Sequence, residues 1–333
     1  MTKPVPVLPD RATHDMRNTA RGDNLFAYHP FVVAAFMFIV ATASRRFNVG
    51  IVAYALMPNH IHIIIRPFLD PDRPSDPVEF RKFLRSNFAR CINAYWRSLG
   101  FDTCGSVMCR DSTGNTIQIL DAETELANIL YVEMNGMRAG LETRPEFLKG
   151  AMSMRRWLTA PVMVTRPLFW FQSRSWEEQE VLQLCLPPKV AATRETVDQF
   201  QARSQRALNR AIQREHGRRR TAGLKSRRLS ALQQQMPTMR PGRSAADYSE
   251  TLVTGNDPEV VAQELHNIRA FRVWHADARR RTCEGEEDVL FPPGTYQAVV
   301  RYGVRVADED YWEATVKRGG ATGPRKRYAE RLE

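Results

Sequence analysis

Two short apolar segments joined by a turn constrain the fold of this chain more than any other feature. Residues 51–57 and 61–66 have the length and β-branched content of strands, and Pro58-Asn59 between them is a turn signal. The run Ile63-Ile64-Ile65 has no polar residue at alternate positions. A strand without that alternation is covered on both faces. The sequence therefore predicts a β-hairpin whose second strand lies inside a sheet.

Helices are expected on either side of this hairpin. Pro30 opens an apolar helix over 31–46, and an arginine-rich amphipathic helix follows over 78–98. A short strand is expected at 116–120. The alternation of helices and strands predicts a small α+β domain, which we place at residues 1–165.

The first 24 residues of this domain are polar and contain several prolines. We expect them to form a mobile arm that includes at most a poor edge strand. Arg17 to Arg21 would be the remnant of an amino-terminal strand, or that strand would be degraded.

The remaining residues, 166–333, are expected to form a mainly helical, basic extension. Phe200 to Arg243 contains twelve arginine or lysine residues against one acid, Glu215. Five of the arginines fall three or four residues apart and share one helical face: Arg203, Arg206, Arg210, Arg214 and Arg218. A further helix is predicted over 257–282, and a turn at 291–296 leads to a predicted strand at 296–301.

Composition indicates the class of binding partner and the cellular compartment. The net charge is +11, and a surplus of that size favours a polyanion such as nucleic acid. The five cysteines form no CxxC pair, which favours reduced thiols in a cytoplasmic protein. The most apolar run, Phe31 to Ala43, is too short to span a bilayer, so we expect no membrane segment.

His60 and His62 are the first candidate functional residues. Side chains at i and i+2 of a strand point to the same face, so both imidazoles project together while Ile61 points into the core. Two neutral imidazoles on a rigid strand form half of a divalent metal site. The alternative is a pair of partly exposed histidines beside a turn. The remaining histidines have no partner at ligand spacing and receive no role: His14, His29, His216, His266 and His275.

Tyr131 and Asn135 are the second candidate pair. Asp121 can cap the helix that carries them, and Gly136 and Gly140 lie where this helix should end. Residues four apart share a helical face, and this face is polar. A tyrosine among polar groups can act as a nucleophile, although an interfacial tyrosine is the alternative.

The segment Tyr54-Ala-Leu-Met-Pro-Asn-His-Ile-His-Ile-Ile-Ile resembles the signature strand pair of the HUH single-tyrosine transposases. Tyr131-Val-Glu-Met-Asn-Gly-Met-Arg-Ala-Gly-Leu is similar to the tyrosine helix of that family. Gly136 and Met137 stand where the family usually has proline and valine. The chain is most similar to the REP-associated tyrosine transposases that carry a long C-terminal extension, and the resemblance is specific over residues 30–141.

This resemblance implies a ferredoxin-like HUH nuclease domain with an antiparallel sheet. It implies that His60, His62 and Asn135 bind Mg2+ or Mn2+ and that Tyr131 attacks a phosphodiester. A 5′-phosphotyrosine would form and a 3′-hydroxyl would be released. This link conserves the phosphodiester, so no nucleotide cofactor is expected. Since Mg2+ prefers oxygen ligands, Mn2+ suits imidazoles better.

Single-stranded or hairpin DNA is the expected partner. Single-strand binders combine basic grooves with aromatic platforms. The candidate DNA contacts outside the basic face of residues 203–218 are Arg81, Arg85, Arg90, Arg97 and Arg110. A homodimer is also expected of this family, because moving a DNA segment requires two cleavages.

Two other functions fit the same residues. One is a domesticated, non-catalytic DNA-hairpin-binding protein that keeps the fold and the basic surface. The other is a replication initiator or relaxase with an HUH site.

Overall fold

The structure, a computed structural model, describes residues 4–317 apart from 5, 21, 27–28, 71, 104–106, 108–115, 142–143, 149, 173, 227–230, 232–236, 238–250 and 296. The chain divides into two compact units. The larger unit is Asp10–Thr254, and the smaller combines Met1–Pro9 with Gly255–Glu333.

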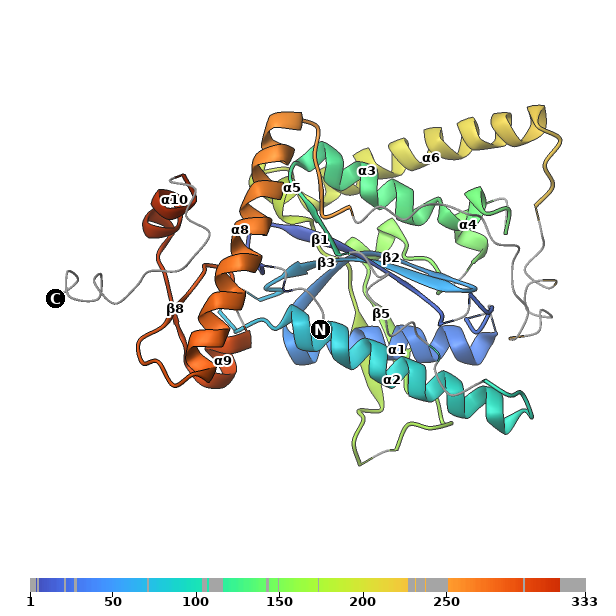
Figure 1. Cartoon of the computed structure of the whole chain (residues 1–333). Helices are drawn as coiled ribbons and strands as arrows, with labels where there is room; N and C mark the ends of the chain where they lie inside the picture. Colours follow the sequence, from blue (N-terminus) through green and yellow to red (C-terminus); the bar gives the residue numbers. More distant parts are fainter. Residues whose placement is uncertain are drawn as a thin grey trace. The chain divides into compact units, whose positions relative to one another are not determined.

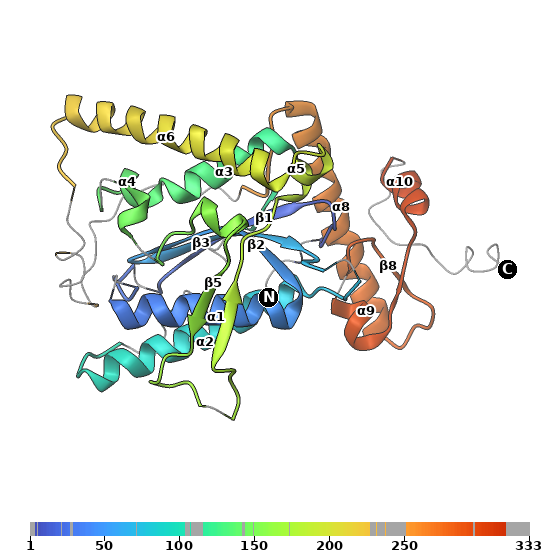
Figure 2. The same ribbon diagram turned by 180° about the vertical axis from the view of Figure 1, so that it is seen from behind.

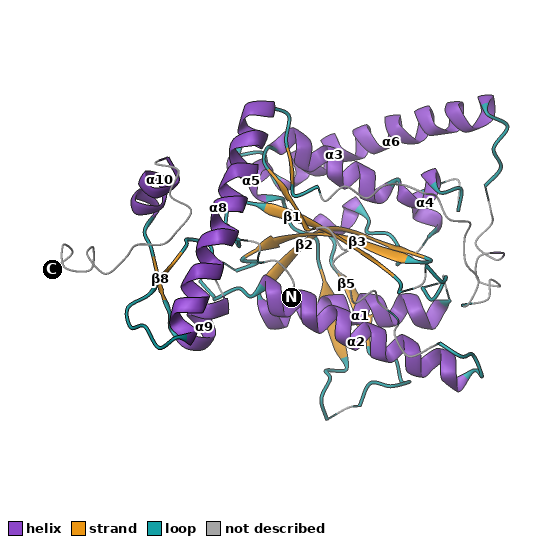
Figure 3. Ribbon diagram, viewed as in Figure 1, coloured by secondary structure: helices purple, strands orange, loops and turns teal. Residues whose placement is uncertain are grey.

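The larger unit is built on a five-stranded sheet (Figures 1 and 3). Its order is β2-β3-β1-β4-β7, with β1 (Ala12–Asn18), β2 (Val49–Met57), β3 (His60–Pro67), β4 (Thr116–Ile119) and β7 (Val253–Thr254). The first four strands pair antiparallel, and β7 joins β4 in parallel. One helix separates β1 from β2 and another separates β3 from β4. This arrangement confirms the predicted α+β class with a ferredoxin-like antiparallel sheet.

Helices cover both faces of the sheet (Figures 1 and 2). The helices α1 (Pro30–Phe47) and α2 (Pro77–Ser98) pack on one face and contact each other. The opposite face carries α3 (Ala122–Glu133), with α6 (Val197–Thr221) alongside it. All nine residues of β2 are buried, as are residues 61–65 of β3. The predicted hairpin, with its second strand covered on both faces, is thereby confirmed.

The helix α1 has the length and apolarity of a membrane span, but most of it is buried within the protein. Phe36, Phe38 and Ile39 are fully buried in the main core, as expected for a core helix.

The amino-terminal strand is complete, so the predicted arm over residues 1–24 is wrong. The strand β1 pairs with β3 over Thr13 to Asn18 and with β4 over Ala12 to Asp15, which makes it an interior strand. Because most residues of β1 are polar, the sequence shows no apolar strand pattern there. Asp15 is 2% exposed, yet it pairs with Arg81 at 2.7 Å and accepts a hydrogen bond from Thr116 at 2.5 Å. A buried charge is tolerated because these partners satisfy it.

Residues beyond 165 contribute to the same unit. The hairpin of β5 (Val162–Thr165) and β6 (Gln179–Leu182) packs against α1, where Arg45 donates two hydrogen bonds to the buried Glu180. The free edge of β2 is covered by residues 151–153 and 184–185, through bonds such as Leu56 N to Ala151 O at 2.7 Å. The expected boundary at residue 165 therefore falls inside the larger unit. That unit also contains 3-10 turns at Pro145–Phe147 and Arg155–Leu158, α4 (Asn135–Arg138) and α5 (Pro188–Ala192).

The smaller unit is mainly helical. The predicted helix over 257–282 is confirmed as α8 (Pro258–Cys283), whose Trp274 packs against Trp312. The predicted strand at 296–301 is wrong, because α9 (Gln297–Tyr302) occupies that segment. The unit also contains β8 (Leu290–Phe291), β9 (Arg305–Val306), which pairs with β8 in parallel, and α10 (Glu309–Lys317).

Candidate active site

Three histidines and Tyr131 gather on the sheet face that α3 covers. The ring centroids of His60 and His62 on β3 lie 4.8 Å apart, and the ring of Tyr131 lies 5.6 Å from that of His62. His14 on β1 joins them, with its ring 5.2 Å from His62 and 6.0 Å from Tyr131. The sheet register explains this meeting. His62 is opposite Met16, so His14 is its diagonal neighbour on the same face.

Burial keeps these imidazoles in the neutral form. It lowers the pKa of His60 to about 4, and it lowers the pKa of His14. The pKa of His62 falls well below its ordinary value, because of burial first and then of the neighbouring His60 and His14. Neutral imidazole is the form that binds metals.

Tyr131 is the accessible member of the cluster. Its side chain is 42% exposed, whereas His14 and His62 are 4% and 2% exposed. The guanidinium carbon of Arg138 lies 5.5 Å from the centroid of the Tyr131 ring. This exposure leaves the phenol accessible to a molecule from solution, and the nearby guanidinium favours an anionic one. The sequence pattern of residues 131–141 gave no reason to place Arg138 beside the Tyr131 ring.

Asn135 does not join the hydrogen bonds of this cluster. The helix α3 ends at Glu133, and Asn135 opens the separate short helix α4. Its amide nitrogen is buried without a hydrogen-bond partner in the described part of the chain. Asn128, one turn before Tyr131, instead contacts His14 with its carbonyl oxygen at 3.1 Å. Asn128 shares the helical face of Tyr131, but no sequence pattern connects it with β1.

The donor set fits a divalent cation in part. His60 and His62 supply two adjacent imidazoles on one rigid strand, and the ring of Tyr131 lies 5.6 Å from that of His62. Within the described residues, no three histidine, cysteine or carboxylate side chains are grouped as a complete metal site. A cation held here would therefore need oxygen ligands from substrate or water. His14 is directed at His62 and not at a common centre.

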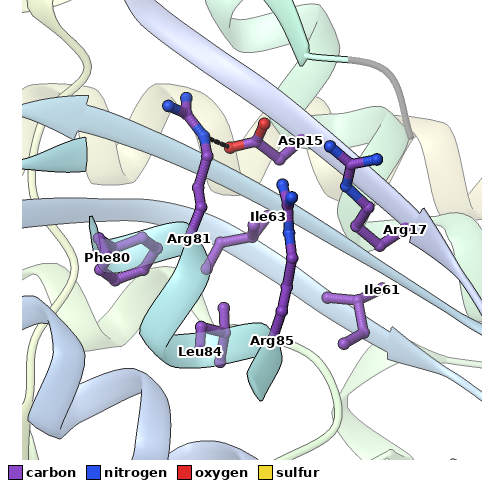
Figure 4. Close-up of a pocket in the computed structure, with 8 residues that line it drawn as sticks. All are labelled: Asp15, Arg17, Ile61, Ile63, Phe80, Arg81, Leu84 and Arg85. Carbon is purple, nitrogen blue, oxygen red and sulfur yellow. Dashed lines mark hydrogen bonds and ion pairs between the residues drawn. The ribbon is translucent and has the colours of Figure 1, made fainter. Parts of the chain in front are cut away.

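Arg81 and Arg85 lie on the opposite face of the sheet. Figure 4 shows them from α2 beside Asp15 and Arg17 of β1, over Ile61 and Ile63. Arg81 binds Asp15 and Thr13, both at 2.7 Å. Burial lowers the pKa of Arg85 to about 10, and the cation of Arg17 adds to this effect. The structure thus separates these two arginines from Tyr131. Arg90 and Arg97 are exposed on the same helix α2.

The arginines of α6 lie on the same side of the sheet as Tyr131. Leu208 and Ile212 of α6 pack against Leu130, Met134 and Met137 around the tyrosine helix. Arg206, Arg210 and Arg214 are exposed. Arg203 is paired with Glu195, and Arg218 with Glu215. Arg110 lies outside the described residues.

Several solved structures are similar to this chain, and two of them are transposases by description. No protein-family model and no curated protein sequence matches the chain. A REP-associated tyrosine transposase bound to a REP hairpin aligns with 42% of this chain and 74% of its own, at 13% identity and a TM-score of 0.32. A proposed transposase from Deinococcus radiodurans aligns with 40% of this chain and 97% of its own, at 18% identity and a TM-score of 0.27.

Proposed function

We propose that this protein is a metal-dependent enzyme that nicks and rejoins single-stranded DNA, as transposases of the HUH type do. The observation that carries the proposal is the meeting of an exposed Tyr131 with the half-buried His60 and the buried His62. The motif resemblance around these three residues supports the same function. The solved transposase bound to a DNA hairpin is consistent with DNA as the partner.

The chemistry follows from the residues. The phenol oxygen of Tyr131 attacks a DNA phosphorus and loses its proton, and the bond to the 3′ oxygen breaks as that oxygen takes up a proton. The product is a 5′-phosphotyrosine with a free 3′-hydroxyl, and attack by a 3′-hydroxyl reverses the step. His60 and His62 would hold Mg2+ or Mn2+, and the bound cation would supply positive charge to neutralise a phosphate. Arg138, beside the Tyr131 ring, adds a fixed positive charge.

Binding to DNA is proposed to use α6 and not the buried arginines of α2. The exposed residues Arg206, Arg210 and Arg214 lie on the helix that packs along the tyrosine helix. Phosphate contacts from such a face position a strand without reading its sequence. Because one tyrosine makes one cleavage at a time, we propose that two copies of the chain act together when a segment moves.

The test is covalent capture of DNA. Single-stranded oligonucleotides tiling both flanks of the encoding gene are incubated with the protein and Mn2+, then separated on a denaturing gel. We expect a protein–DNA adduct that disappears in Tyr131→Phe and in the double variant His60→Ala, His62→Ala. Tyr302→Phe is the matched control, because Tyr302 is 78% exposed on α9 and lies outside the site.

Three outcomes would contradict the proposal. An adduct that persists in Tyr131→Phe would show that another group is the nucleophile. Binding to DNA that needs no metal, with no adduct on any oligonucleotide, would favour the non-catalytic DNA-hairpin-binding protein. An adduct formed only on a replication-origin or transfer-origin strand would favour the initiator or relaxase.

A further inference from the structure

A chain of hydrogen bonds links the tyrosine helix to His62 through two residues that the proposed chemistry does not use. The Asn128 amide nitrogen donates to the carbonyl oxygen of Thr124 at 2.9 Å. The Asn128 side-chain oxygen lies 3.1 Å from Nδ1 of His14. Nε2 of His14 lies 3.0 Å from Nδ1 of His62. Three elements, α3, β1 and β3, are thus joined by side-chain contacts.

Each link in this chain has one permitted direction. The Thr124 carbonyl can only accept, so it fixes the Asn128 amide with its nitrogen toward Thr124 and its oxygen toward His14. That oxygen also only accepts, so Nδ1 of His14 carries the hydrogen. A neutral imidazole has one N–H, which makes Nε2 of His14 an acceptor. Nδ1 of His62 must then donate to it, and Nε2 of His62 keeps its lone pair.

The surroundings of both rings are consistent with neutral imidazoles. His14 and His62 are 4% and 2% exposed, and a charged imidazole in such a place is costly. His60 has the same tautomer, and a single contact accounts for it. Its Nδ1 lies 2.7 Å from the side-chain oxygen of Asn59, so its lone pair is also on Nε2. The two rings therefore present the same kind of nitrogen.

We propose that His14 and Asn128 are positioning residues that hold His62 as its Nδ1–H tautomer, with Nε2 available to a divalent cation. The cation rests on the proposed function, but the tautomer does not. Metal-binding histidines commonly donate their second ring N–H to a fixed acceptor, and loss of that acceptor typically weakens metal binding by about 10- to 100-fold. Here the acceptor is itself a histidine, oriented by the helix that carries the nucleophile.

The position of Asn128 on α3 gives this chain of hydrogen bonds a second role. Asn128 and Tyr131 are three residues apart on α3 and share a helical face. The contact from Asn128 to His14 therefore ties the position of the nucleophile to the position of the His62 ring.

The first measurement is the tautomer of His62 in the metal-free full-length protein, by 15N NMR of the imidazole nitrogens. The His62 signals are assigned by their absence in His62→Gln. In the wild type we expect a hydrogen on Nδ1 and none on Nε2. In His14→Leu and Asn128→Leu we expect Nε2–H to appear. In His14→Gln the side-chain oxygen can still accept, so the wild-type tautomer should be kept.

The second measurement is Mn2+ affinity by titration calorimetry on the same proteins. His14→Leu should bind Mn2+ about 10- to 100-fold more weakly than wild type, and His14→Gln should recover most of the loss. His266→Leu is the matched control, because His266 is exposed on α8. Thermal unfolding checks that each variant is folded, and Asn128→Leu replaces His14→Leu if the latter is not.

Three results would overturn the proposal. They are a wild-type His62 with its hydrogen on Nε2, a tautomer unchanged in a folded His14→Leu or Asn128→Leu, and Mn2+ binding equally strong in His14→Leu and wild type. Failure of the nicking function is separate. It would appear as an absent DNA adduct with the Nδ1–H tautomer still in place.

Discussion

At the scale of single residues, the site depends on imidazoles that stay neutral in a buried setting. His60, His62 and His14 have lowered pKa values, each with burial as the largest cause. A histidine with a folded pKa below its unfolded value takes up its proton less readily in the native state. The unfolded chain then binds more protons over the intervening pH range, so stability rises with pH in that range.

This argument predicts an acid-sensitive fold. The pKa of His60 is lowered from 6.5 to about 4. Its contribution to stability is complete above about pH 6.5 and is lost as the pH falls toward 4, by on the order of 3 kcal/mol. His60→Gln, measured against its own value at pH 8, should lose less stability than wild type over this range. Urea unfolding at a series of pH values checks this. Parallel curves for the two proteins would show that His60 does not titrate abnormally.

At the scale of elements, a buried ion pair holds the tyrosine helix to the hairpin. Glu133, the last residue of α3, accepts a hydrogen bond from Nε of Arg155 at 2.5 Å. Arg155 also donates to the Val52 carbonyl of β2 at 3.0 Å. Both side chains are at most 1% exposed. Burial raises the pKa of Glu133 although Arg155 opposes it, so this carboxylate depends on its partner.

Removing one partner should therefore cost more than removing both. Arg155→Met leaves an unpaired buried carboxylate and should lower the free energy of unfolding by about 3–5 kcal/mol. Adding Glu133→Leu to it should recover much of that loss, since no charge is then left buried. Chemical denaturation of the two single variants and the double variant forms a double-mutant cycle. Additive losses would mean that the pair does not couple α3 to β2.

At the scale of the whole molecule, the net charge is +11, and several of the arginines that contribute to it are exposed on α6. Binding of DNA by basic residues releases counterions, so affinity falls with salt in proportion to the phosphates contacted. Replacing Arg206, Arg210 and Arg214 together with glutamine should lower the slope of log affinity against log salt by about 2–3.

The measurement is DNA binding by fluorescence anisotropy at several salt concentrations. The control has the same charge change in exposed arginines away from α6, namely Arg46, Arg73 and Arg174. It should keep a slope closer to that of wild type. An equal reduction in both triple variants would show that net charge, and not α6, sets the affinity.

Much of the larger unit could be predicted from the sequence, because its signals are local. The helices α1 and α2 and the hairpin of β2 and β3 follow from periodicity, prolines and turn residues within each segment. The period of a strand puts His60 and His62 on one face, and the period of a helix puts Tyr131 on a polar face. Their selection as site residues came from the resemblance of the two motifs. These features need only residues that are near one another in the chain.

The tertiary structure alone decided which distant residues complete the site. His14 is 46 positions before His60, and no spacing rule connects them; the pairing of β1 with β3 does. The strand β1 looked unsuitable because Asp15 is charged, and it is stable inside the sheet since Arg81 and Thr116 satisfy that charge. The same contact turned Arg81 from a predicted DNA ligand into a structural residue. Local pattern determines which elements form, whereas burial and partners supplied by remote segments determine what each polar side chain does.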